Sequence, residues 1–156
     1  MTATDASLSE EEAQVVPQEL EAIQLAESTK DYGRAKQILD QVIACCPTYA
    51  SAYNNRAQLL RLMGEREAAL ADLNEAIRRA EQSRRPSVQR LALCQRGIVH
   101  REGGRTEEAF HDFEAAGRLG LNDARRMAVA CNPYATLCNS IMQEMLDNLY
   151  YSRHQQ

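Results

Sequence analysis

The stretch that decides the fold is YNNRAQLLRLMGEREAALADLNEAI, which covers residues 53–77. It reads as two amphipathic helices joined at Gly64, because apolar residues recur every three or four positions on both sides of that glycine. Small residues stand at Ala57, Ala69 and Ala76, where two helices can approach closely. A helix pair of this kind cannot bury both apolar faces by itself, so we expect it to stack on further pairs.

The composition of the 156-residue chain is that of one all-α domain. Hydrophobic residues make up 44% of it and charged residues 26%, and good helix formers dominate. Almost no stretch alternates with the period of two that strands require. No apolar run approaches the roughly 18 residues of a membrane span, and residues 1–14 lack the parts of a secretory signal. We therefore expect a cytoplasmic protein without a membrane partner.

The sequence carries no motif of catalysis or metal binding. It contains no glycine-rich phosphate loop, no GxSxG and no HExxH, so we expect no enzyme and no cofactor. The cysteines are odd in number, form no CxxC pair and fall at mostly apolar helical positions, where we expect small buried hydrophobes rather than metal ligands. These cysteines are Cys45, Cys46, Cys94, Cys131 and Cys138.

Glycine, proline and capping residues divide the chain into helices. We expect the first helix to begin at Pro17, Thr48 to cap the third, and Pro133 to open the last after Asn132. Residues 1–14 contain four acidic residues and no basic one, which favours a disordered acidic tail. Residues 152–156 read as a frayed end.

The helix pairs repeat. Three positions recur after 34 residues and again after 40, namely Ala35, Leu39 and Val42, then Ala69, Leu73 and Ala76, then Ala109, Phe113 and Ala116. This spacing resembles the tetratricopeptide repeat, a helix–turn–helix of 34 residues. It predicts a domain over residues 15–151 with repeats at about 16–49, 50–83 and 90–121, capped by two helices over 122–151. Ile23 stands where the first repeat should carry a small residue, so we expect looser packing there. The expected fold is a right-handed superhelix of three helix pairs.

A more specific resemblance lies in three segments: YNNRAQ at 53–58, Arg96-Gly97, and NPYATLCN at 132–139. Together they are similar to the tetratricopeptide repeat protein 36 family, from about Glu19 to Met145. Family members usually carry a longer N-terminal leader, so no role of that leader is carried over. The resemblance implies a protein-binding adaptor associated with the 70-kDa heat-shock chaperone. It implies, as alternatives, a regulatory scaffold in the turnover of tyrosine-breakdown enzymes or in cilium assembly.

In such a superhelix the first helix of each pair lines a concave groove, where extended peptides commonly bind. The repeat register places six candidate residues on that wall: Asn54, Asn55, Gln58, Arg61, Gln95 and Arg101. Amides can bond a peptide backbone and arginine can fork onto a carboxylate. We expect an acidic or C-terminal peptide as the partner, with Asn55, Arg61 and Arg101 as its main contacts. A polar wall that binds nothing is the alternative.

Chaperone-binding repeat domains hold a peptide's terminal carboxylate in a clamp of two lysines, two asparagines and one arginine. Only Asn55 matches that clamp, since the other four positions carry Leu20, Gln24, Leu91 and Gln95. A carboxylate that leaves water needs charge-assisted donors, so this clamp is not expected to work here.

An arginine-rich stretch, residues 78–105, is a second candidate surface. It holds eight arginines against Glu81 and Glu102. Solvated helix faces, a docking surface for an acidic partner, and nucleic-acid binding are the three interpretations. The last is disfavoured by the net charge of −4 and by the lack of interleaved aromatic residues.

The last helix, 137–151, is apolar over much of its circumference. We expect it to cap the third repeat of a monomer, and a dimer or docking face is the alternative.

Overall fold

The computed structural model describes the backbone of residues 4–153, and the side chains of that range except those of residue 136 and residues 147–153. Within it the chain forms eight helices and no strand. They are α1 (Glu10–Thr29), α2 (Tyr32–Cys45), α3 (Ala50–Leu62), α4 (Arg66–Gln82), α5 (Pro86–Glu102), α6 (Thr106–Arg118), α7 (Asn122–Cys131) and α8 (Pro133–Arg153).

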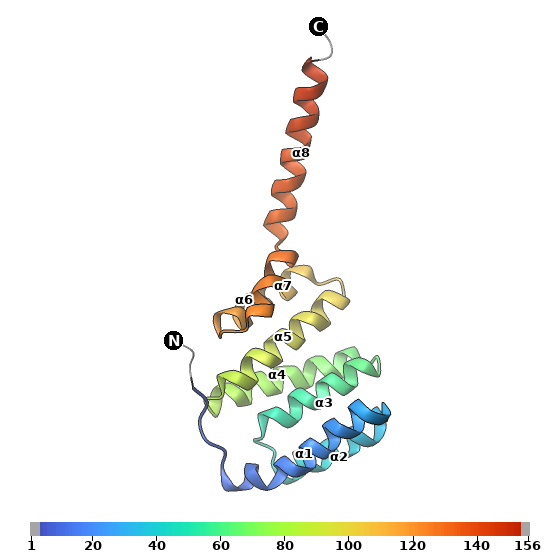
Figure 1. Ribbon diagram of the computed structural model, residues 1–156, viewed down its shortest axis with the longest axis vertical. Coiled ribbons are helices and arrows are strands. Elements are labelled where there is room, and N and C mark those ends of the chain that lie inside the picture. Colours follow the sequence, from blue (N-terminus) through green and yellow to red (C-terminus); the bar gives the residue numbers. More distant parts are fainter. Residues whose placement is uncertain (1–3, 154–156) are drawn as a thin grey trace.

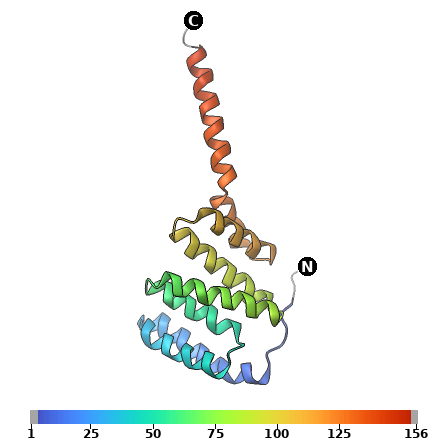
Figure 2. The ribbon, with the colours of Figure 1, turned by 180° about the vertical axis from the view of Figure 1, so that it is seen from behind.

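The first six helices form three stacked pairs, and the fold is the right-handed all-α superhelix that the repeat spacing predicts. Each helix packs on its partner in the pair, and α2, α3, α4 and α5 join one pair to the next. Figure 1 looks onto the side of α1 and α3, whereas α2 and α4 face the viewer in Figure 2. One side of the stack is therefore built from the first helices of the pairs.

Small and large residues interlock between the helices. Leu39, Leu73 and Phe113 are fully buried at equivalent places in the three second helices. A Cβ atom added to Gly97 of α5 would lie 2.7 Å from Cε1 of Phe113, so only glycine fits against that ring. Gly64 ends the third helix with a φ of 84°, in the left-handed region expected of it.

Two partly buried ion pairs recur at the same place in successive repeats. Arg56 of α3 binds Asp72 of α4 through Nε and Nη2, both at 2.7 Å, and Arg96 of α5 binds Asp112 of α6 in the same fork. Each arginine also reaches the preceding repeat, where Arg56 donates to Asp40 at 2.8 Å. The hydrogen bonds that Arg56 donates to Asp72 raise the pKa of Arg56 above its ordinary value, so its charge is permanent. These arginines fasten each repeat to the one before it.

The expected start of the first helix at Pro17 is wrong. α1 begins at Glu10, because Ser9 and Glu12 form a capping box in which each side chain bonds the other's backbone N–H. Glu12 is buried against Arg85, with Oε2 at 2.5 Å from Nη2. Residues 10–14 are therefore helical and not part of a disordered tail. The Thr48 cap is also wrong, since Tyr49 holds the cap position of α3 without a side-chain bond.

The segment ahead of α1 runs along the edge of the stack to the turn between α4 and α5 (Figure 1). The Ala6 N–H donates to the carbonyl of Arg84 at 3.1 Å, and the Ser87 N–H donates to the carboxylate of Asp5 at 2.9 Å. Burial alone would raise the pKa of Asp5, but the bonds from Ser87 lower it on balance. The acidic segment thus meets the arginine-rich turn of the same chain.

Two helices follow the third pair, and they differ in how they relate to it. α7 packs on α6 and buries Ala124, Ala128 and Cys131. α8 starts at Pro133, with only Asn132 between it and α7. It extends away from the stack along the long axis of the molecule (Figures 1 and 2). The end of the stack is therefore covered by α7, while α8 stands clear of it.

Candidate peptide-binding groove

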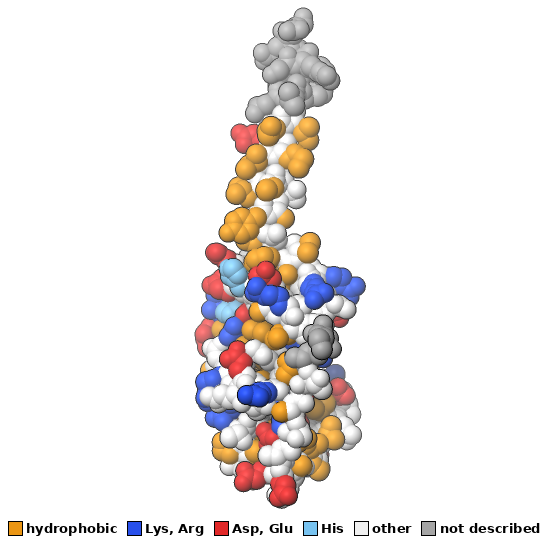
Figure 3. Space-filling view, turned by 90° about the vertical axis from the view of Figure 1, so that its left-hand side faces the viewer, with side chains coloured by type: hydrophobic (Ala, Val, Ile, Leu, Met, Phe, Trp, Pro, Cys, Tyr) orange, Lys and Arg blue, Asp and Glu red, His pale blue; other side chains and the backbone are white. Residues whose placement is uncertain are grey.

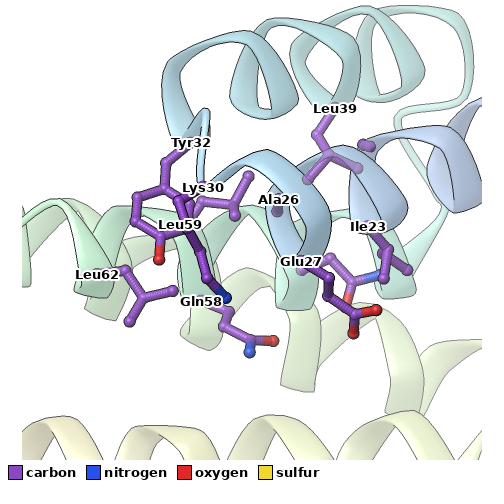
Figure 4. Close-up of a pocket in the computed structure, with 11 residues that line it drawn as sticks. Ile23, Ala26, Glu27, Lys30, Tyr32, Leu39, Gln58, Leu59 and Leu62 are labelled. Carbon is purple, nitrogen blue, oxygen red and sulfur yellow. The ribbon is translucent and has the colours of Figure 1, made fainter.

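An open pocket of about 130 Å³ lies between α1, the start of α2 and α3. Its floor is apolar, and Gln58 and Leu62 of α3 lie across from Ile23, Ala26 and Glu27 of α1 (Figure 4). The other residues that line it are Ala22, Lys30, Tyr32, Leu39, Asn55 and Leu59. The pocket therefore opens on the side of the first helices, where a peptide groove was expected.

Small residues of α1 make room for this pocket. The sequence register placed Ile23 at the position of close helix approach, but Ala22 is the buried residue there and Ile23 is only half-buried. Leu62, at the end of α3, remains 46% exposed at the pocket. An apolar side chain of a partner could cover Ile23 and Leu62 without displacing any residue of the core.

Asn55, the one residue that matches the chaperone-tail clamp, is already bonded to a carboxylate of this chain. Its Nδ2 donates to Oε1 of Glu19 at 2.6 Å, and Tyr49 and Ser51 donate to the same carboxylate at 2.5 Å. Glu19 is buried. Burial of Tyr49, together with the hydrogen bond that its hydroxyl donates to Glu19, raises the pKa of Tyr49. Sequence reasoning missed Glu19, because nothing in the helical pattern distinguishes a buried glutamate from a solvated one.

The remaining amides differ in accessibility. Asn54 is buried, and its Nδ2 lies 3.4 Å from Oδ1 of Asn55, so it does not belong to the groove wall as predicted. Gln58 is exposed at the pocket, and Gln95 is half-buried on α5. Of the four amides, Gln58 is placed best to bond a peptide backbone.

The two predicted arginines are held differently. Arg61 donates to Oε1 of Glu102 at 2.9 Å and so links α3 to α5. The guanidinium of Arg101 lies over the ring of Phe113, 5.8 Å from its centre, and no carboxylate of the described residues is within ion-pair distance of it. Arg101 is therefore the more available cation.

Half of the arginine-rich stretch is paired inside the chain. Arg78 and Arg79 share Glu75, Arg85 binds Glu12, and Arg96 binds Asp112. Hydrogen bonding from Arg78 lowers the pKa of Glu75, as expected for a carboxylate between two guanidinium groups. The other four, Arg84, Arg90, Arg101 and Arg105, have no ion pair among the described residues. The basic surface is thus smaller than the sequence indicates.

Neither His100 nor Cys94 is arranged as an activated catalyst. Burial lowers the pKa of His100, whose Nε2 lies 3.6 Å from Asp112, and burial raises the pKa of the Cys94 thiol. Among the side chains that the structure describes there is no cluster of three His, Cys, Asp or Glu that could hold a metal ion. No helix within residues 4–153 combines the length and apolarity needed to cross a bilayer.

Residues 38–78, which include the whole stretch 53–77, match the family model described as tetratricopeptide repeat. Over 136 residues the chain is 45% identical to tetratricopeptide repeat protein 36 of Danio rerio, covering 87% of this chain and 71% of that one. The chain belongs to this family. The Homo sapiens member is 40% identical over 148 residues, covering 89% of this chain and 77% of its own length. The tetratricopeptide repeat protein 36 homolog of Drosophila melanogaster is 43% identical over 132 residues, covering 84% of this chain and 69% of that one.

Solved structures confirm the fold. The first repeat domain of Spaghetti (RPAP3), bound to the HSP90 peptide SRMEEVD, superimposes with a TM-score of 0.68 at 16% identity, covering 80% of this chain and 95% of that one. The second repeat domain of human RPAP3, in complex with the HSP70 peptide SGPTIEEVD, gives 0.64 at 22% identity, covering 77% and 97%. At such identities the likeness concerns the fold alone.

Proposed function

We propose that this chain is a non-catalytic adaptor that binds a peptide segment of the 70-kDa heat-shock chaperone on its α1–α3–α5 side. The observation that carries the proposal is the open apolar pocket between α1 and α3, with the exposed amide of Gln58 at its edge. Membership of the tetratricopeptide repeat protein 36 family supports it, because the sequence resemblance to that family implied the chaperone association.

In this proposal the pocket receives an apolar side chain of the peptide. The peptides bound by the two RPAP3 domains, SRMEEVD and SGPTIEEVD, both carry an apolar residue just before their Glu-Glu-Val-Asp end. A methionine or isoleucine side chain there would cover Ile23 and Leu62, while Gln58 bonds the peptide backbone. Gln95 and Arg101 of α5 would contact the acidic residues that follow.

The terminal carboxylate of the peptide has little part in this mode of binding. Leu20 and Leu91, both exposed, stand at two of the clamp positions, and the Nδ2 donor of Asn55 is held by Glu19. A further carboxylate next to Glu19 would meet a like charge instead of a cation. Affinity for the peptide therefore comes from the peptide's apolar side chain and acidic side chains, and not from its terminal carboxylate.

A charge placed at the pocket tests the proposal. We expect the peptide SGPTIEEVD to bind Leu62→Glu at least tenfold more weakly than wild type in calorimetric titration, a change of about 1.4 kcal/mol. Met63→Glu is the matched control, because Met63 is the next residue, is similarly exposed (41% against 46%) and does not line the pocket. Equal binding by the two variants, or no binding by wild type, would refute the proposal.

A further inference from the structure

The largest unexplained feature of the molecule is an apolar stripe on α8. Six large side chains of this helix are between 49% and 69% exposed, and Cys138 on the same side is exposed as well. Figure 3 shows apolar side chains along the projecting helix, above the mixed surface of the stack. The α8 stripe consists of Tyr134, Leu137, Cys138, Ile141, Met142, Met145 and Leu146.

No residue that the structure describes covers this stripe. The main contact of α8 with the stack is to α6, at the base of the helix. Monomeric proteins rarely expose contiguous apolar surface of this kind unless it is an interaction site. The turn at Asn132-Pro133 directs α8 away from α7, and only Asn132 separates the two helices.

The spacing of the stripe is self-complementary. Its residues follow one another at steps of three and one, and Leu149 continues these steps in the sequence. The same steps result when the helix is read backwards, with Ile141 opposite Met142, Cys138 opposite Met145, and Leu137 opposite Leu146. We propose that a second copy of this chain covers the stripe, by antiparallel pairing of the two α8 helices in a two-fold symmetric dimer.

The shape of the molecule selects the antiparallel arrangement. Packed helices lie about 8–10 Å apart, and the stack at the base of α8 is much wider than one helix (Figures 1 and 2). Parallel pairing would push the two stacks into each other, because α8 follows α7 after a single residue. Antiparallel pairing places the stacks at opposite ends of a pair of helices that are each about 31 Å long.

The same arrangement also covers the end of the stack. A hollow at α6 and α7 is lined by Phe110, Ala128 and Val129 among others, and Val129 is exposed. In an antiparallel pair the far end of one α8 reaches this end of the other copy. The α8 stripe and this hollow are thus both met by the second copy.

Charge is compatible with self-association. Glu144 is the one Asp, Glu, Lys or Arg in residues 133–146. Two copies therefore do not repel each other along the stripe, and the stripe offers few charges with which to select a different, oppositely charged partner. This composition favours a second copy over an acidic or basic foreign segment.

Mass measurement tests the dimer. We expect light scattering of the wild-type chain to approach twice the monomer mass as concentration rises, and Ile141→Glu to remain a monomer with unchanged helix content. Ser140→Glu adds the same charge next to the stripe but not on it, and we expect it to dimerise like wild type. A wild-type chain that stays monomeric at every concentration, or an Ile141→Glu variant that still dimerises, would overturn the proposal.

Disulfide trapping tests the orientation. In a Cys45→Ser background, which removes the other exposed thiol, Met145→Cys places a new thiol opposite Cys138 of the second copy. Mild oxidation should then give a covalent dimer with Met145→Cys and little without it. Efficient trapping through Cys138 alone would mean parallel pairing and would overturn the antiparallel arrangement.

Discussion

At the scale of single residues, buried and half-buried charges form contacts between helices that the apolar pattern does not specify. Arg56 joins Asp72 of its own repeat to Asp40 of the preceding one, and Glu19 collects three donors beside the pocket. The 40-residue offset between Arg56 and Arg96, and between Asp72 and Asp112, is visible in the sequence. Their pairing could not be inferred from it, because a helical pattern does not say which charged residues face a neighbouring helix.

Removal of Arg56 should destabilise the stack strongly. We expect Arg56→Ala to lower the free energy of unfolding by about 2–4 kcal/mol, because Asp72 stays buried without a partner. Arg118→Ala breaks the exposed ion pair with Glu114 and should change the free energy of unfolding by less than about 0.5 kcal/mol. Chemical denaturation of both variants measures the difference, and similar losses for the two would contradict the role given to Arg56.

His100 should make the fold sensitive to acid. Burial lowers its pKa below the ordinary 6.5, despite the opposing charge of Asp112. Below about pH 6.5 the unfolded chain therefore binds a proton that the folded chain refuses, so the free energy of unfolding falls as the pH drops. We expect a His100 pKa below 6.5 by NMR titration and a flatter acid limb of stability in His100→Gln. A measured pKa at or above 6.5 would rule out this origin of acid sensitivity.

At the scale of helices, most boundaries could be predicted, and the failures have physical causes. Gly64 placed the end of α3 within two residues and Pro133 placed the start of α8, since few other residues tolerate those backbone positions. The start of α1 was missed because Pro17 reads as a first-turn residue, although the Ser9–Glu12 capping box was present in the sequence. The bond from Glu12 to Arg85, which holds that first turn on the stack, is a long-range contact that no local pattern reveals.

The contact between α5 and α6 should tolerate no larger residue at position 97. We expect Gly97→Ala to destabilise the chain by about 1–3 kcal/mol, because its Cβ would meet the buried ring of Phe113 at 2.7 Å. Gly33→Ala is the matched control, since its Cβ would meet only Asp31 Oδ1 at 3.8 Å, and it should be neutral or slightly stabilising. Thermal unfolding compares them, and a stable Gly97→Ala would show that the helices separate more easily than inferred.

At the scale of the whole molecule, the repeat spacing predicted the superhelix, and the pocket between α1 and α3 lies on the side of the first helices. The spacing did not predict that most polar side chains of the groove wall would already be buried or bonded to other residues of the same chain. Asn54 is buried, Asn55 is bonded to Glu19 and Arg61 to Glu102, so the accessible part of the groove is more apolar than its sequence suggests. Nor did it predict the course of α8, because an apolar helix has the same pattern whether it covers its own stack or another chain.

The measurement that tests the central claim most directly compares three versions of the peptide SGPTIEEVD by calorimetric titration into the wild-type chain. We expect the free acid and the C-terminally amidated peptide to bind within about twofold of each other, because the chain offers no carboxylate clamp. Replacement of the peptide's isoleucine by alanine should weaken binding about tenfold, or 1.4 kcal/mol, because the pocket between α1 and α3 loses its occupant. Loss of binding on amidation, with the alanine peptide bound as well as the original, would contradict the claim.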